Sequence, residues 1–189
     1  MTREEFIQIL DEKGYSYEIE GDKIIVNCYG DVFLNVLSVI PPDVIFKNEG
    51  DVSLDALTDL SQGVVFENKG NVYLRDLTTL SPGVVFKNEG HVDFGSLKTL
   101  PPGVVFENGW NIYFRALTTL STDVVFKNSG SVWLDVLTTI SPGVVFKNMT
   151  NISLDALTGG YFMFSDCNIG GIDSKRLLNF MISKGIFER

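Results

Sequence analysis

Residues 70–89 read GNVYLRDLTTLSPGVVFKNE, and the same 20-residue pattern occurs six times in register between residues 30 and 149. None of the six units contains an insertion or a deletion. A fixed short period of this kind is typical of a solenoid, in which each repeat forms one coil stacked on the previous one. The sequence therefore predicts a repeat architecture for most of the 189-residue chain.

Comparing the units position by position separates inward-facing from outward-facing residues. Val72 and Leu74 represent two positions that are apolar in all six units, whereas the position of Tyr73 between them varies freely. This alternation with a period of two predicts a strand with one buried face. Val84-Val85-Phe86 follows the turn sequence Ser81-Pro82-Gly83 and predicts a second strand. We therefore expect an all-β fold, a parallel β-solenoid with 20-residue coils and two short strands per coil.

Two further positions are the same in every unit and predict internal ladders. The first is always Phe and should form an aromatic stack inside the solenoid; its members are Phe46, Phe66, Phe86, Phe106, Phe126 and Phe146. The second is always Asn; its members are Asn48, Asn68, Asn88, Asn108, Asn128 and Asn148. Stacked asparagines can bond to one another and to turn backbone at every coil. Alternatively, each Asn only adopts a left-handed conformation before the glycine that begins most units.

The N-terminal segment, residues 1–29, should close one end of the solenoid. Thr2-Arg3-Glu4-Glu5 is a capping box that predicts a helix ending near Gly14. Residues 15–20 and 23–28 should then form a hairpin around Gly21-Asp22. The second arm matches the Val-Val-Phe-Lys-Asn pattern with Cys28 in the Asn position, so we expect it to be the first half-coil.

The C-terminal segment should close the other end. The repeats, assigned to residues 30–166, depart from the pattern at Gly159-Gly160 and end in a strand over residues 162–166. Residues 167–189 should form a helical cap, with the helix beginning at Asp173 and ending at Gly185. Because an uncovered coil would expose open strand edges, closure by helices favours a discrete body over a fibre. We expect all three segments to fold as one cooperative domain.

The repeat pattern resembles a known class of short repeats. The unit L-x-x-L-T-T-L-S-P-G-V-V-F-K-N, here Leu74 to Asn88, resembles 20-residue β-solenoid repeats of uncharacterised bacterial and phage proteins over residues 24–166. It is also similar to the shortest leucine-rich repeats, although its spacings of four, two and two differ from their three, two and three. The resemblance implies a fold and no activity.

Composition limits the partners and the compartment. The chain has 15 Lys and Arg residues against 24 Asp and Glu residues, a net charge of −9. Such a surface repels the phosphates of nucleic acid, so we expect no direct nucleic-acid binding. It suits a basic protein partner, including one that normally binds nucleic acid. Alternatively, the negative charge only keeps the protein soluble. Cys28 and Cys167 lie too far apart along a rod for a disulfide, and no signal peptide or membrane span is evident. We expect a cytoplasmic protein, in the host cytoplasm if phage-encoded.

Few residues with catalytic chemistry are present. His91 is the single histidine, so neither a histidine metal site nor a Ser-His-Asp triad has enough members. Charged residues of alternating sign, Asp55 and Arg75 among them, indicate surface ladders and not a catalytic cluster. We expect no enzyme activity, no metal and no cofactor.

One outward face carries residue types that are common at protein interfaces. Aromatic residues project from the variable strand position and the adjacent corner, with arginines beside them, and residues 90–110 depart most from the repeat. We assign a candidate binding face to Tyr73, Arg75, His91, Asp93, Trp110, Tyr113, Arg115 and Trp133. The alternative is that the aromatic side chains only brace neighbouring strands.

A second surface is a row of apolar residues. Since Val84 and Phe86 should point inward, Val85 should point outward. We call the equivalent residues the valine stripe: Ile45, Val65, Val85, Val105, Val125 and Val145. A twofold homodimer would cover this stripe, although a β-forming surface can also tolerate it.

These features favour a non-catalytic solenoid that binds another protein, in one version an acidic, phage-type inhibitor that occupies a basic site on a host protein. The first alternative is a structural homodimer or assembly subunit. The second is a carbohydrate-binding module that uses Tyr73, Tyr113 and Trp133.

Overall fold

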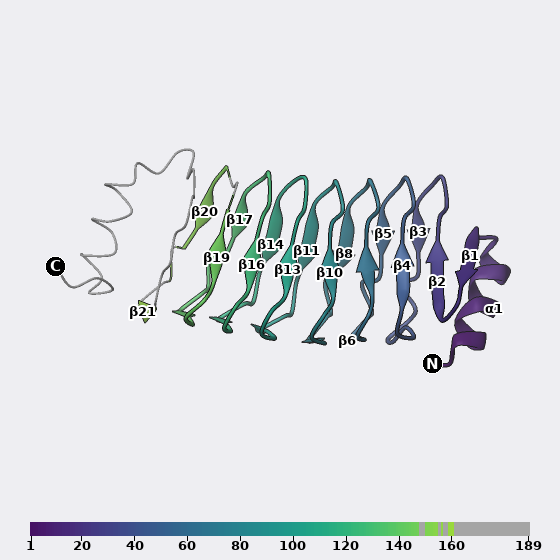
Figure 1. Cartoon of the computed structure of the whole chain (residues 1–189), viewed down its shortest axis with the longest axis horizontal. Helices are drawn as coiled ribbons and strands as arrows, with labels where there is room; N and C mark the ends of the chain where they lie inside the picture. Colours follow the sequence, from purple (N-terminus) through teal and green to yellow (C-terminus); the bar gives the residue numbers. More distant parts are fainter. Residues whose placement is uncertain (148–149, 155, 157–158, 161–189) are drawn as a thin grey trace.

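The computed structural model describes residues 1–147, 150–154, 156 and 159–160. These residues form a parallel β-solenoid of about six coils, with one helix at the N-terminal end (Figure 1). Strands of neighbouring coils pair in parallel with a register of 20 residues, as Val85 does with Val105 and Phe86 with Phe106. The register predicted from the 20-residue period is therefore confirmed.

Two long sheets form opposite sides of the solenoid. An 8-stranded sheet contains β1 (Tyr17–Glu20), β2 (Lys23–Val26), β4 (Val44–Phe46), β7 (Val65–Phe66), β10 (Val85–Phe86), β13 (Val105–Phe106), β16 (Val125–Phe126) and β19 (Val145–Phe146). A 7-stranded sheet contains β3 (Val32–Phe33), β5 (Val52–Ser53), β8 (Val72–Leu74), β11 (Val92–Phe94), β14 (Ile112–Phe114), β17 (Val132–Trp133) and β20 (Ile152–Ser153).

The expectation of two strands per coil is wrong, because most coils contain a third. The Thr-Leu segment, which was assigned to neither predicted strand, is itself a strand. Its members are β6 (Asp59–Leu60), β9 (Thr79–Leu80), β12 (Thr99–Leu100), β15 (Thr119–Leu120) and β18 (Thr139–Ile140), and β21 (Gly159–Gly160) pairs with β18. Thr79 is exposed and Leu80 is buried, so the segment alternates as a strand does. Leu80 follows the previous inward leucine, Leu77, by three positions, so the sequence lacks the period of two that predicts a strand.

The third sheet is divided into two parts, β6-β9 and β12-β15-β18-β21. Ser81 N–H donates to the Leu60 carbonyl at 3.0 Å, and Ser141 N–H donates to the Leu120 carbonyl at 2.9 Å. The corresponding residue between the two parts is Pro101, which has no N–H to donate. The missing donor explains why pairing stops between β9 and β12.

The interior is filled by stacked side chains, as the repeat predicted. Phe46, Phe66, Phe86, Phe106, Phe126 and Phe146 form a continuous stack with ring centroids 5.0–5.2 Å apart. The rings of Phe94 and Phe114 stack with centroids 4.9 Å apart. They contact the stack described above edge-on, and the centroid of Phe94 lies 5.3 Å from that of Phe86. Edge-to-face contacts of this kind are favourable, so the two columns hold the sheets together across the core.

The asparagine ladder bonds to backbone. Asn68 Nδ2 donates to the Gly70 carbonyl at 2.8 Å and to the Gly50 carbonyl of the previous coil at 3.4 Å. Asn48 and Asn88 repeat this arrangement. The alternative of a left-handed Asn is wrong for the five described members, because the only non-glycine residues with positive φ in the described ranges are Asp43 and Asp123. These two aspartates occupy the turn position held by glycine in the other units.

The N-terminal helix and hairpin are confirmed. Helix α1 (Arg3–Lys13) begins with the Thr2–Glu5 capping box and ends at Gly14, which has a φ of 69°. Strand β2 pairs antiparallel with β1 and parallel with β4, so it is the first half-coil. The expected C-terminal strand and helix lie outside the described residues.

The N-terminal segment also contacts the end of the 7-stranded sheet. Phe6 and Leu10 of α1 belong to the same buried cluster as the coils. The Tyr15 hydroxyl accepts from Phe33 N–H at 2.8 Å and donates to the Phe33 carbonyl at 3.4 Å. It therefore occupies the position that a neighbouring strand would take beside β3.

Candidate functional site

The outer face of the 7-stranded sheet carries most of the unusual side chains. In strand β8, Val72 and Leu74 are fully buried and Tyr73 between them is half-buried. The register places Tyr73, Asp93, Tyr113 and Trp133 in one outward row along β8, β11, β14 and β17. The sheet therefore holds residues that are 20 to 60 positions apart in the sequence on one surface.

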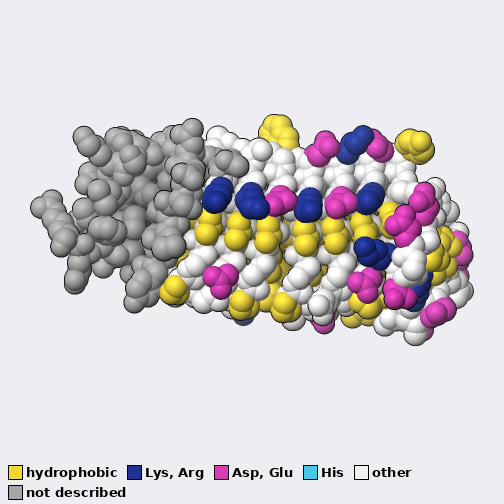
Figure 2. Space-filling model, in the orientation of Figure 1, with side chains coloured by type: hydrophobic (Ala, Val, Ile, Leu, Met, Phe, Trp, Pro, Cys, Tyr) yellow, Lys and Arg dark blue, Asp and Glu magenta, His cyan; other side chains and the backbone are white. Residues whose placement is uncertain are grey.

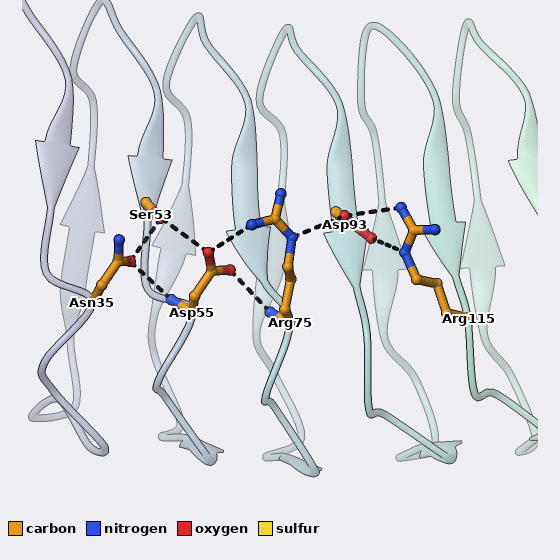
Figure 3. A network of polar contacts seen from close by, with 6 residues as sticks. All are labelled: Asn35, Ser53, Asp55, Arg75, Asp93 and Arg115. Atoms are coloured by element: carbon orange, nitrogen blue, oxygen red, sulfur yellow. Dashed lines mark hydrogen bonds and ion pairs between the residues drawn. The ribbon is translucent and has the colours of Figure 1, made fainter.

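Charged side chains on this face form a continuous network (Figure 3). Asp55 Oδ2 lies 2.9 Å from Arg75 Nη1, and Arg75 Nε lies 3.4 Å from Asp93 Oδ2. Arg115 reaches Asp93 from the other side with two hydrogen bonds, of 3.0 Å from Nε and 3.2 Å from Nη2. The order of charges is minus, plus, minus, plus, so the network is neutral and confirms the expected ladder.

Asp93 is the centre of this network. It is only 6% exposed, whereas the side chains of Arg75 and Arg115 are more than half exposed. The hydrogen bonds and the negative charge of Asp93 raise the pKa of the Arg115 guanidinium further above its usual range. A buried carboxylate needs hydrogen-bonding and charged partners, and the two arginines supply them to Asp93.

Gly95 makes the network possible. It occupies the position that Arg75 and Arg115 hold in the neighbouring coils, so no side chain stands between the two arginines. A Cβ at Gly95 would also overlap the carbonyl oxygen of Arg75. Both arginines can therefore turn toward the same carboxylate, although they lie two coils apart.

Aromatic side chains form a cluster beside the network. Tyr113 and Trp133 stack with ring centroids 6.2 Å apart. The His91 ring lies 5.5 Å from Trp110 and 5.8 Å from Tyr113. Trp110 is 60% exposed and Trp133 is 37% exposed, so the cluster presents apolar area to solvent.

Arginine also contacts the rings. The Arg75 guanidinium lies 4.9 Å from the centroid of Tyr73, and that of Arg115 lies 6.0 Å from the centroid of Tyr113. Partial burial, with the negative charge of Asp51 as a second cause, raises the pKa of the Tyr73 hydroxyl. The structure thus joins all eight residues of the candidate binding face through the network, the aromatic cluster and these contacts. Its aromatic members also brace neighbouring strands.

A hollow of about 360 Å³ opens on this face between β14 and β17. It is lined by Tyr113, Phe114, Arg115, Trp133, Asp135 and Val136. Sequence reasoning did not include Asp135 or Val136 in the binding face. Both stand at repeat positions that were visible in the sequence, but the sequence does not show that a hollow forms between these two coils.

A second ladder on this face was also missed. Asp51 Oδ1 accepts from Asn71 N–H at 2.7 Å, and Asn71 Oδ1 accepts from His91 N–H at 2.8 Å. Asp31 and Asn111 bond to the next coil in the same way. The signal in the sequence was a column of Asp and Asn at the second position of four of the units. These bonds fix the spacing of the coils beneath the aromatic cluster.

The valine stripe lies on the 8-stranded sheet. Val65, Val85, Val105, Val125 and Val145 are half-buried, while Ile45 is buried, so the stripe is less exposed than expected. The residue after each inward Phe is charged, and these residues form a row parallel to the stripe. In this row Lys47 Nζ lies 3.4 Å from Glu67 Oε2, and Lys127 Nζ lies 2.8 Å from Glu107 Oε1. Figure 2 shows the apolar row and the charged row side by side along the body.

Other chemistry is sparse in the described ranges. They contain no group of three or more His, Cys, Asp or Glu side chains arranged to hold a metal ion. Cys28 is a buried free thiol, and burial raises its pKa. No helix within these ranges is long and apolar enough to cross a membrane.

Comparison of the chain with models of protein families, with curated proteins and with solved structures finds no match.

The network predicts a specific loss of stability. Asp93→Asn removes the buried charge that both arginines face, so the free energy of unfolding should fall by about 1–2 kcal/mol, a range that allows for solvent screening at the exposed guanidinium groups. Urea denaturation monitored by circular dichroism measures this change. Asp135→Asn is the matched control and should change the value by less than about 0.5 kcal/mol. Equal effects of the two substitutions would contradict the central role of Asp93.

Proposed function

We propose that this protein is a non-catalytic binding protein that presents the outer face of the 7-stranded sheet to another protein. The observation that carries the proposal is the exposed aromatic cluster of His91, Trp110, Tyr113 and Trp133 beside Arg75 and Arg115. Trp, Tyr and Arg are the residues that contribute most binding energy at protein interfaces.

The rigidity of the support favours a binding role. Backbone ladders, the Asp–Asn ladder and the arginine network hold these side chains on paired strands. A preorganised surface loses little conformational entropy when a partner binds. The face can therefore bind with few contacts, provided that the partner matches its shape.

The charge of the chain favours a basic partner. With 24 acidic and 15 basic residues, the protein attracts cationic surfaces at long range and repels nucleic acid. A protein whose basic site normally binds phosphate fits this description. We propose that occupation of such a site is the mode of action, which would make the protein an inhibitor of its partner.

An affinity pull-down from the native host tests the proposal. The wild-type protein should retain a basic protein in stoichiometric amount, and Trp110→Ala with Trp133→Ala should weaken its binding at least about tenfold. Tyr29→Ala is the matched control, since Tyr29 is 93% exposed but lies outside the candidate face. Binding that survives the double substitution, or that Tyr29→Ala removes equally, would contradict the assignment of the face. Retention of a glycan that Trp133→Ala abolishes would favour the carbohydrate-binding alternative instead.

A structural homodimer is the second candidate, and the valine stripe favours it. Parallel pairing places Val65, Val85, Val105 and Val125 in one straight row, with ion pairs along its margin. A row of this kind, covered by a second copy about a twofold axis, would give an apolar centre with a charged rim.

Light scattering distinguishes this candidate. If the stripe is the interface, the wild-type protein should have the mass of a dimer, and Val85→Lys with Val105→Lys should halve it, because buried charge opposes association. Val36→Lys introduces the same charge at a residue that is already 80% exposed, and it should leave the mass unchanged. A dimer that persists in the double variant, or a wild-type monomer, would exclude an interface at the stripe.

A further inference from the structure

The hollow between β14 and β17 combines aromatic rings with a carboxylate. Tyr113 and Trp133 supply its aromatic rings, and Asp135 and Val136 also line it. The Asp135 carboxylate accepts a hydrogen bond from the Ser153 hydroxyl. Within the part of the chain that the structure describes, Asp135 forms no ion pair.

The charges around the hollow do not cancel. Arg115, which also lines it, is turned toward Asp93 and makes two hydrogen bonds there (Figure 3). Arg75 lies between Asp93 and Asp55, so the two arginines are matched by two aspartates. Among the described residues, Asp135 remains as one negative charge without an ion pair, and it lines the hollow together with two aromatic rings.

We infer that this hollow is an anchor for a single cationic side chain, Arg or Lys, of a basic protein partner. The inference rests on the proposed function and names the group that the aromatic face recognises. A cation in the hollow would lie against the indole of Trp133 and near the carboxylate of Asp135. Trp is the ring that attracts cations most strongly, and the attraction adds to that of the carboxylate.

Other ligand classes fit less well. An anion would meet the unpaired charge of Asp135, while the Arg115 guanidinium is already committed to a carboxylate. A neutral sugar could stack on Trp133 but would gain nothing from the negative charge. The hollow therefore selects by charge as well as by shape.

The experiment follows the two indole N–H signals of the protein by NMR, since the chain contains only two tryptophans. The probe is N-acetyl-arginine amide, a small cation, and its neutral counterpart is N-acetyl-citrulline amide. Trp133→Phe assigns the signals. The cation should shift the Trp133 signal in a saturable manner and leave that of Trp110 in place.

Variants separate charge from shape. Asp135→Asn keeps an acceptor for the Ser153 hydroxyl and should weaken probe binding about fivefold to tenfold, since it removes one charge next to a bound cation. Asp31→Asn removes one charge from the far end of the same face and should leave probe binding unchanged. Similar binding of the citrulline analogue or of a methyl glycoside, an unaltered affinity in Asp135→Asn, or no saturable shift would overturn the inference.

The pull-down separates this inference from the proposed function. A captured partner that binds Asp135→Asn as tightly as the wild type would keep the proposed function and overturn the cationic anchor. Charge-dependent binding of the probe without any captured partner would support the anchor and count against a protein-binding role.

Discussion

The pairing of each residue with the residue 20 positions later is the constraint on which the rest of the structure depends. It places Phe over Phe and valine over valine, and it brings Asn48, Asn68 and Asn88 against turn backbone, so the same contacts recur along the solenoid. Parallel β-structure is stable only when its faces are covered, and here the coil covers its own interior. The repeat therefore needs no second layer of helices, and both long sheets keep one face free.

The free face of the 7-stranded sheet shows what a solenoid can do with positions that do not build the core. Inward columns are nearly invariant, whereas the outward column contains Phe, Ser, Tyr, Asp and Trp. At Asp93 and Gly95 the pattern is broken twice within one coil, and the result is a buried carboxylate bonded to arginines from the coils on either side. Residues that depart from the repeat thus form the polar network on the surface, while residues that follow the repeat form the core.

Much of the fold could be predicted from the sequence because each inward position of the repeat occurs six times with the same kind of residue. The Phe stack and the first half-coil at β2 both followed from such positions. The third strand did not, since its inward leucine follows the previous inward leucine by three positions and not by two. The site was predicted only as a group of residues. Its geometry depends on the absence of a side chain at Gly95, which lets Arg75 and Arg115, 40 positions apart, share Asp93.

The most direct test of the account is the distance between coils in solution. Nitroxide labels on cysteines at positions 49 and 129, and at 29 and 129, would sit four and five coils apart on one exposed corner, in a background with Cys28 and Cys167 replaced by serine. Electron spin resonance should give narrow distributions near about 19 Å and about 24 Å, because each coil adds about 4.8 Å. Broad distributions, or a second distance no longer than the first, would contradict coils stacked in register.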